Sequence, residues 1–141
     1  YNESKATGGG SAILPTPAIG GVGLLDDSSR MATIAFKAEG EALLLIGHTS
    51  GHLGQSLWLR ECQGREEGLT PAVDLAIERR HGEFVRGLIG QGKVSAVHDC
   101  SDGGALVALA EMALAGTIGA QVPLPDAANA AAIAFGEDQG R

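Results

Sequence analysis

Most of the chain after residue 30 alternates between short apolar runs and longer segments of helical pattern. Apolar runs of strand length, bounded by glycine, proline or charged residues, predict strands. Longer segments in which apolar residues recur every three or four positions predict helices. The predicted strands are residues 32–36, 42–46, 94–97 and 118–122, and the predicted helices are about 55–61, 71–89, 103–115 and 127–134.

The longest predicted helix, residues 71–89, has the clearest boundary. Thr70 is the expected N-cap, and Pro71 suits the first helical position because the N–H that it lacks would have no partner there. The apolar residues that fall on one face of this helix are Val73, Ile77, Phe84 and Leu88.

The order of these elements predicts an α+β domain with a mixed β-sheet and helices packed on it. The two strands 32–36 and 42–46, separated by a glycine-containing turn, are expected to pair with each other. The turn-forming residues Asp26 to Ser29 predict a boundary near residues 26–30. Because the chain opens at Tyr1 and closes with a glycine-rich charged segment, we expect a fragment whose sheet is truncated at its C-terminal end.

Composition and charge narrow the class of protein. With 44% apolar residues and no apolar stretch near the roughly 20 residues that span a membrane, the chain is typical of a globular domain. Its 17 acidic and 10 basic residues give a net charge of −7, which disfavours nucleic acid as a partner. A small phosphorylated ligand remains compatible, because helix N-termini hold phosphate without a basic surface. The widely separated Cys62 and Cys100 fit a reduced, cytosolic compartment.

The sharpest local pattern, residues 98–104, lies where a predicted strand gives way to a helix. Free amides at the helix start favour an anion, and either aspartate of the segment could hold magnesium or a ribose hydroxyl. The alternative, favoured by the spacing alone, is that Ser101 or Asp102 simply caps the helix. The candidate nucleotide- or substrate-binding residues here are His98, Asp99, Ser101, Asp102, Gly103 and Gly104.

A second polar cluster closes the chain at residues 135–141. Its carboxylates, amide and guanidinium stand between glycines and could orient a polar ligand, although a charged surface turn has the same composition. The candidate binding residues are Glu137, Asp138, Gln139 and Arg141. Elsewhere, the glycine between His48 and His52 argues against a rigid metal pair, and neither cysteine has a base nearby in sequence. We therefore predict no metal site and no catalytic residue.

Five segments, in order along the chain, resemble motifs of one known enzyme family. Residues 1–4 resemble the end of GGNVSxYNET, residues 15–23 resemble PTPxIGxVG, and residues 53–59 resemble LGGSEYL. Residues 98–104 with 111–113 resemble HDVSDGGL followed by AEMA, and residues 135–141 are FGEDQGR itself. The family is the large subunit of phosphoribosylformylglycinamidine synthase, also called formylglycinamide ribonucleotide amidotransferase or PurL. The departures are Ser4 for Thr, Gln55-Ser56-Leu57 for Gly-Ser-Glu, and Cys100 for Val.

This resemblance implies a fold and an activity for a longer parent protein. Residues 1–29 would be the tail of a PurM N-terminal-like domain with its linker, and residues 30–141 an incomplete PurM C-terminal-like domain. The parent would be a cytoplasmic ligase that uses ATP and Mg²⁺ to join ammonia, supplied by a glutaminase subunit, to formylglycinamide ribonucleotide. Its partners would include a small PurS-type subunit. The family's main catalytic residues lie upstream of the matched motifs, so we expect the isolated chain to be inactive.

In the parent's second half, residues 137–139 would occupy the position that corresponds to a substrate-contacting segment of its first half. Their role there would be substrate contact, binding of an auxiliary nucleotide or domain contact. Two other functions are compatible with the sequence. One is a related synthetase of the PurM superfamily, such as aminoimidazole ribonucleotide synthetase or selenophosphate synthetase, which the FGEDQGR and PTP segments argue against. The other is a module that binds a nucleotide or docks on other domains without catalysis.

Overall fold

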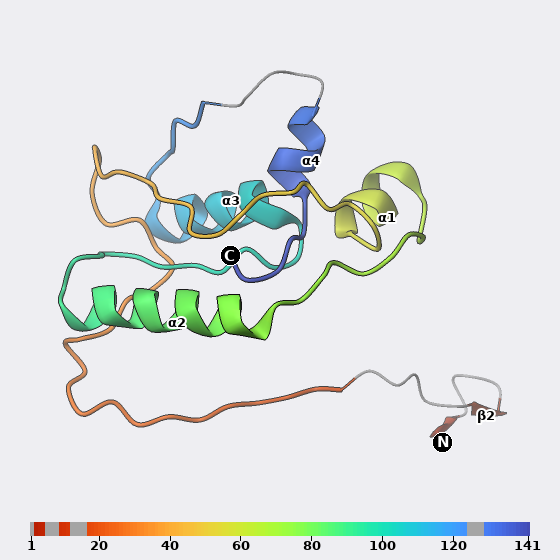
Figure 1. Cartoon of the computed structure of the whole chain (residues 1–141), viewed down its shortest axis with the longest axis horizontal. Coiled ribbons are helices and arrows are strands. Elements are labelled where there is room, and N and C mark those ends of the chain that lie inside the picture. Colours follow the sequence, from red (N-terminus) through yellow and green to blue (C-terminus); the bar gives the residue numbers. More distant parts are fainter. Residues whose placement is uncertain (1, 5–8, 12–16, 124–128) are drawn as a thin grey trace.

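The computed structural model describes residues 2–4, 9–11, 17–123 and 129–141 of the chain. In chain order, these residues form the strands β1 (Asn2–Ser4) and β2 (Gly9–Ser11) and the helices α1 (Leu57–Gln63), α2 (Leu75–Gly90), α3 (Gly104–Gly116) and α4 (Ala130–Phe135) (Figure 1). No helix in these ranges is both long and apolar enough to cross a membrane.

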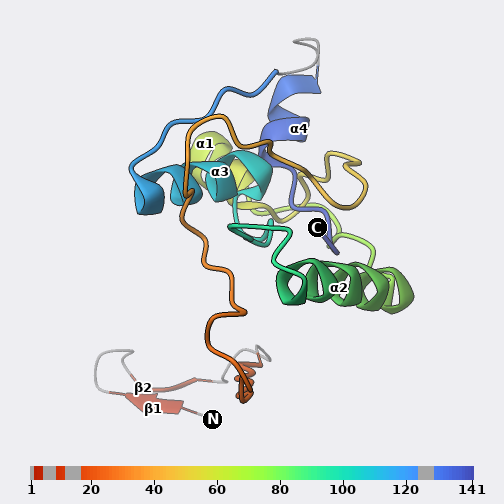
Figure 2. The same cartoon turned by 90° about the vertical axis from the view of Figure 1, so that its left-hand side faces the viewer.

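The helices gather into one body, from which the N-terminal part of the chain extends. Helices α3 and α4 pack on each other, and the last residues of the chain run between them and α2 in both views (Figures 1 and 2). The antiparallel pair β1–β2 lies away from the helices, at the end of an extended segment. Within that segment Ile19, Val22 and Leu24 are almost wholly exposed.

The buried part of the described chain is small and contains polar residues. Its buried apolar residues are Ala108 of α3 and Ala134 of α4, whose short side chains let the two helices approach closely. Its buried polar residues are Ser56 and Asp138. Buried polar groups need hydrogen-bond partners, so the contacts of Ser56 and Asp138 are part of what holds this fold.

The predicted mixed sheet is the main difference between the sequence and the structure. In the described residues, the runs 32–36 and 94–97 meet at a single parallel bridge, Thr33 to Ala96, where Val97 N donates to Thr33 O at 3.0 Å. The predicted pairing of 32–36 with 42–46 is wrong, and residues 42–46 and 118–122 form no strand. An apolar run favours a strand, but it forms one only where a second run lies beside it. The order of the runs along the chain favoured pairing of neighbours, whereas the run that pairs with residues 32–36 is a distant one.

The helices follow the sequence pattern more closely. Helix α1 starts two residues after the predicted position, at the Ser56 N-cap, whose hydroxyl accepts from Leu59 N at 3.2 Å. It ends where Gly64 adopts a φ of 62°, a conformation that glycine takes without strain. Helices α3 and α4 also form in the predicted regions, and each ends one residue after the predicted position. Residues 127 and 128 of the fourth predicted helix lie outside the described residues.

The start of α2 corrects the predicted N-cap. Asp74, rather than Thr70, caps the helix, because its carboxylate accepts from Ala76 N at 2.9 Å and from Ile77 N at 3.0 Å. One aspartate oxygen thus satisfies two of the amides that a helix start leaves without partners. Pro71 precedes the helix and lines a cavity.

The two possible caps can be separated by mutation. We expect Asp74→Ala to lower the free energy of unfolding by about 1 kcal/mol, because two amides at the start of α2 lose their acceptor. Thr70→Ala should leave it unchanged, within about 0.5 kcal/mol. Urea unfolding followed by circular dichroism measures both, and a larger loss for Thr70→Ala than for Asp74→Ala would contradict the observed helix start.

Candidate functional site

The candidate site is the segment from Gly136 to Arg141, which follows α4 and lies against residues 49–52. Its first residue is buried where two backbones meet: a Cβ added to Gly136 would lie 2.9 Å from Gly51 Cα. Gly51 itself has a φ of 77° and faces Ala132 of α4. These two glycines let the closing segment reach residues 49–52.

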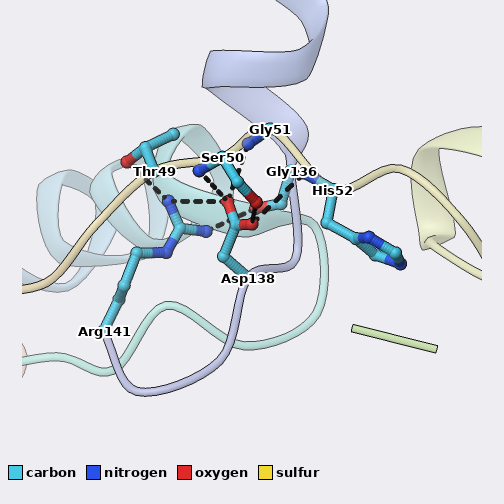
Figure 3. A network of polar contacts seen from close by, with 7 residues as sticks. All are labelled: Thr49, Ser50, Gly51, His52, Gly136, Asp138 and Arg141. Carbon is cyan, nitrogen blue, oxygen red and sulfur yellow. Dashed lines mark hydrogen bonds and ion pairs between the residues drawn. The ribbon is translucent and has the colours of Figure 1, made fainter. Parts of the chain in front are cut away.

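Asp138 is the centre of this contact, as Figure 3 shows. Its Oδ2 accepts from Ser50 N at 3.2 Å and from Gly51 N at 3.0 Å. Its Oδ1 accepts from His52 N at 3.3 Å and from the Ser50 hydroxyl in a short hydrogen bond. Arg141 Nη1 lies 3.7 Å from Oδ2 and completes an ion pair inside the molecule. A buried carboxylate with this many donors is well satisfied.

These contacts decide the charge of Asp138. Burial alone would raise the pKa of its carboxyl, but the hydrogen bonds from Ser50, Gly51 and His52 and the positive charge of Arg141 lower that pKa below its usual value. The group is therefore ionised at neutral pH.

Arg141 is held as firmly as its partner. Its side chain is completely buried, Nη1 donates to Thr49 Oγ1 at 3.1 Å, and Nη2 donates to Gly136 O at 2.5 Å. Among the described residues its Nε has no acceptor. The backbone oxygen of Arg141 accepts from Cys100 N at 3.1 Å, so the closing segment also reaches the loop before α3.

Glu137 joins the starts of two helices. Its Oε1 accepts from Leu57 N, the first residue of α1, and from Gly103 N, the N-cap of α3, each at 2.8 Å. Its own N–H donates to His52 O at 2.8 Å. The Gly103 amide lies at the helix start that the sequence suggested for an external anion, and it holds this internal carboxylate instead.

The expectation that a local side chain caps α3 is wrong. Neither Ser101 nor Asp102 caps the helix, which begins after Gly103 with a φ of 78° and no side-chain hydrogen bond at the cap. A Cβ added to the next residue, Gly104, would lie 2.5 Å from Gly136 O. The paired glycines thus let the closing segment approach the helix start, where Glu137 supplies the acceptor.

The other residues of the 98–104 segment form a separate polar cluster. His98 Nε2 lies 2.7 Å from Glu111 Oε2 of α3, and His98 Nδ1 lies 3.2 Å from Asp99 Oδ1. The Ser101 hydroxyl donates to Asp99 and is the main cause that lowers the pKa of that carboxyl. Burial raises the pKa of the neighbouring Cys100 thiol, which disfavours the reactive thiolate.

Two cavities flank the closing segment. The smaller, about 200 Å³, contains Asp102 and Glu137 together with Arg60 of α1. The larger, about 280 Å³, contains Asp138 and Gln139. Its other polar residues are His48, Ser50, His52, Asp74, Glu78 and His81. Four of the predicted residues therefore line these two cavities, and six line neither of them: His98, Asp99, Ser101, Gly103, Gly104 and Arg141.

Sequence reasoning missed two groups that line these cavities. His81 donates from Nδ1 to Gly140 O at 2.8 Å, which fixes α2 to the closing segment, and its position in a helical run gave no signal. Arg60 had no signal for the same reason. The imidazole of His52, considered only for metal, hydrogen-bonds Leu69 O at 2.8 Å through Nε2. No group of three histidine, cysteine or carboxylate side chains in the described part of the chain could hold a metal ion.

Replacing Glu137 should show what the carboxylate stabilises. We expect Glu137→Ala to lower the free energy of unfolding by about 2 kcal/mol, because two partly buried amides lose their acceptor. Glu66→Ala, which removes another carboxylate of the same cavity, should change it by less than about 0.5 kcal/mol. Urea unfolding at neutral pH compares the two, and equal losses would contradict the capping role of Glu137.

The lowered pKa of Asp138 predicts that the free energy of unfolding decreases in acid. Because folding lowers the pKa of this carboxyl, its contribution is complete above its unfolded pKa of about 3.9 and is lost as the pH falls through the lower folded value. We expect Asp138→Asn to be less stable than the unmodified chain at pH 7, with a difference that narrows toward pH 3. Urea unfolding across this range measures it, with the exposed Asp26→Asn as control. A difference that widens in acid would contradict the assignment.

Comparison with known proteins identifies the family. The model of the family "AIR synthase related protein, C-terminal domain" matches residues 38–141. Over the whole chain, the sequence is 65% identical to the phosphoribosylformylglycinamidine synthase subunit PurL of Novosphingobium aromaticivorans. It is 64% identical to the subunit of the same name from Rhodopseudomonas palustris strain BisB5 and 61% identical to that from Nitrobacter hamburgensis.

The chain spans 19% of the length of the first two of these relatives and 18% of the third. Their names confirm the resemblance to PurL that five sequence motifs indicated. The family match also fits the expected PurM C-terminal-like class, although the described residues contain little strand. Since the family model covers residues 38–141, the chain belongs to the AIR synthase related protein family through its C-terminal domain.

Proposed function

We propose that this chain works as one domain of an ATP-dependent C–N ligase, phosphoribosylformylglycinamidine synthase. The reaction would convert formylglycinamide ribonucleotide to formylglycinamidine ribonucleotide in purine biosynthesis. The observation that carries the proposal is the identity of 65% over all 141 residues to a PurL subunit. The match extends over the entire chain, so the compared region includes the closing segment as well as the helices.

The chain would supply structure and ligand contacts rather than the catalytic groups. Residues 30–141 would form the C-terminal-type domain, and residues 1–29 would belong to the domain before it. The exposed apolar side chains of Ile19, Val22 and Leu24 support this division, because an extended apolar segment is stable only when another surface covers it. The Ser101 hydroxyl and the His98 imidazole each bond a carboxylate and not each other, which is compatible with a structural role for these residues.

Within the ligase, the ligand-facing residues of this chain would be those at the two cavities. Asp102 and Glu137 would act from one cavity, and Asp138 and Gln139 from the other. Gln139 is the candidate best suited to direct contact, because it is exposed and its amide can both donate and accept. The remaining predicted residues, His98, Asp99, Ser101, Gly103, Gly104 and Arg141, would hold the loops in place.

The cofactors and partners are proposed for the whole ligase. ATP and Mg²⁺ would be its cofactors, and a glutaminase subunit and a small PurS-type subunit would be its partners in the cytoplasm. The start of α3 does not offer the Gly103 amide to a nucleotide phosphate, because that amide is bonded to Glu137. We therefore assign no step of the reaction to a nucleotide held by this chain alone.

Turnover by two forms of the chain tests the proposal. The isolated chain, incubated with ATP, Mg²⁺, ammonia and formylglycinamide ribonucleotide, should form no product. A chimera in which this chain replaces the matching part of the Novosphingobium aromaticivorans PurL should turn over at a rate near that of the unmodified protein. An inactive but folded chimera would count against the ligase assignment, and turnover by the isolated chain would refute its dependence on other domains.

Ligand contact by Gln139 can be tested in the same chimera. We expect Gln139→Ala to raise the KM for ATP or for formylglycinamide ribonucleotide by about fivefold, because one direct hydrogen bond is worth about 1 kcal/mol. Gln91→Ala, which removes the exposed glutamine after α2, is the matched control. An unchanged KM for both substrates would remove Gln139 from the ligand-facing set.

A further inference from the structure

Gln139 lies between two residues of the closing segment that are each held by a distant part of the chain. On one side, the carboxylate of Asp138 is bonded to the backbone of residues 50–52. On the other side, the carbonyl oxygen of Gly140 accepts a hydrogen bond from His81 of α2. Gln139 is exposed, and it lines the larger cavity together with both of its neighbours and His81. The backbone is therefore held on either side of this side chain.

The contact between α2 and Gly140 is close. Gly140 has a φ of 74°, and a Cβ added to it would lie 3.2 Å from Glu78 Cγ. Glu78 and His81 are three positions apart, so they are neighbours on one side of α2. Both views show the closing segment beside this helix (Figures 1 and 2). The left-handed conformation and the close approach both favour glycine at this position.

The hydrogen bond to Gly140 decides which tautomer His81 adopts. A carbonyl oxygen can only accept, so the proton of this 2.8 Å bond belongs to Nδ1. The bond therefore depends on one nitrogen of the ring. A replacement side chain keeps the bond only if it presents a donor at the same distance from the backbone as Nδ1.

We propose that His81 is a positioning residue, which holds Gly140 O through Nδ1 and so keeps Gln139 in place at the larger cavity. This inference rests on the proposed function, in which Gln139 contacts ligand, and adds the residue that orders this contact. Glycine has more backbone freedom than any other residue, so the bond restrains the chain next to Gln139 where it would otherwise move most. A side chain that is ordered before binding costs less affinity to immobilise.

The dynamics of the isolated chain test the inference without turnover. The amide nitrogen of Asn in His81→Asn can take the place of Nδ1, whereas that of Gln in His81→Gln takes the place of Nε2. We expect ¹⁵N relaxation to give the Gln139 N–H an order parameter of about 0.85 in the unmodified chain and in His81→Asn. In His81→Gln and His81→Ala it should fall below about 0.6. Equal order parameters in all of these chains would overturn the inference.

Kinetics of the chimera with the Novosphingobium aromaticivorans PurL test the consequence for the ligand. His81→Ala should raise the same KM that Gln139→Ala raises, by about threefold, and leave kcat unchanged. The double variant should have the KM of Gln139→Ala alone, because His81 acts through Gln139. A KM that rises by the product of the two single effects would overturn the positioning role, since His81 would then act independently.

Two control variants and two readouts separate the possible failures. His81→Asn should keep the KM of the unmodified chimera, and so should Arg86→Ala, which removes an exposed side chain of α2 that lines neither cavity. A folded but inactive chimera would count against the ligase function, while the relaxation measurement would still decide the role of His81. An active chimera in which Gln139→Ala raises KM and His81→Ala does not would refute only the positioning role.

Discussion

The fold depends on two neighbouring carboxylates that collect backbone amides from distant parts of the chain. Asp138 accepts from Ser50, Gly51 and His52, and Glu137 accepts from the first residue of α1 and the N-cap of α3. With few apolar side chains buried, these bonds fix where the helix starts lie relative to one another. A buried carboxylate is costly unless every oxygen is satisfied, so the surrounding glycines, which permit the close approaches, are part of the same constraint.

This arrangement changes the meaning of the helix-start pattern. The free amides before α3 suit an anion, and the anion that meets them is a side chain of the same molecule. A phosphorylated ligand at this point would have to displace Glu137 from Gly103 and leave its carboxylate without that donor. The adjacent cavities, which carry Asp102 on one side and Gln139 on the other, require no such displacement. In the proposed ligase, the chemistry would then depend on what other domains add to these two cavities.

Much of the helical structure follows from local sequence, whereas the choice of the α2 cap and the strand pairing do not. Serine and glycine at the ends of α1 act within a few residues, so their effect is visible in the sequence. Asp74 is a cap of the same local kind, but Thr70-Pro71 offered an equally good pattern, and only the folded chain decides between them. The prediction of the sheet was wrong for a different reason. Strand pairing joins residues that are far apart in sequence, such as Thr33 and Ala96, and strand propensity does not indicate which segments pair.

By itself, the sequence determined the family, the approximate helices and the two segments that hold most of the polar groups. Motifs and helix patterns are formed by residues that are close in sequence, so they can be recognised without knowing how the chain folds. Only the tertiary structure decided what those polar groups do, because Glu137 meets Gly103 and Leu57 across 34 and 80 residues, and Asp138 meets Ser50 across 88. Contacts over such separations depend on how the whole chain folds, so no local pattern shows that these carboxylates bind backbone amides.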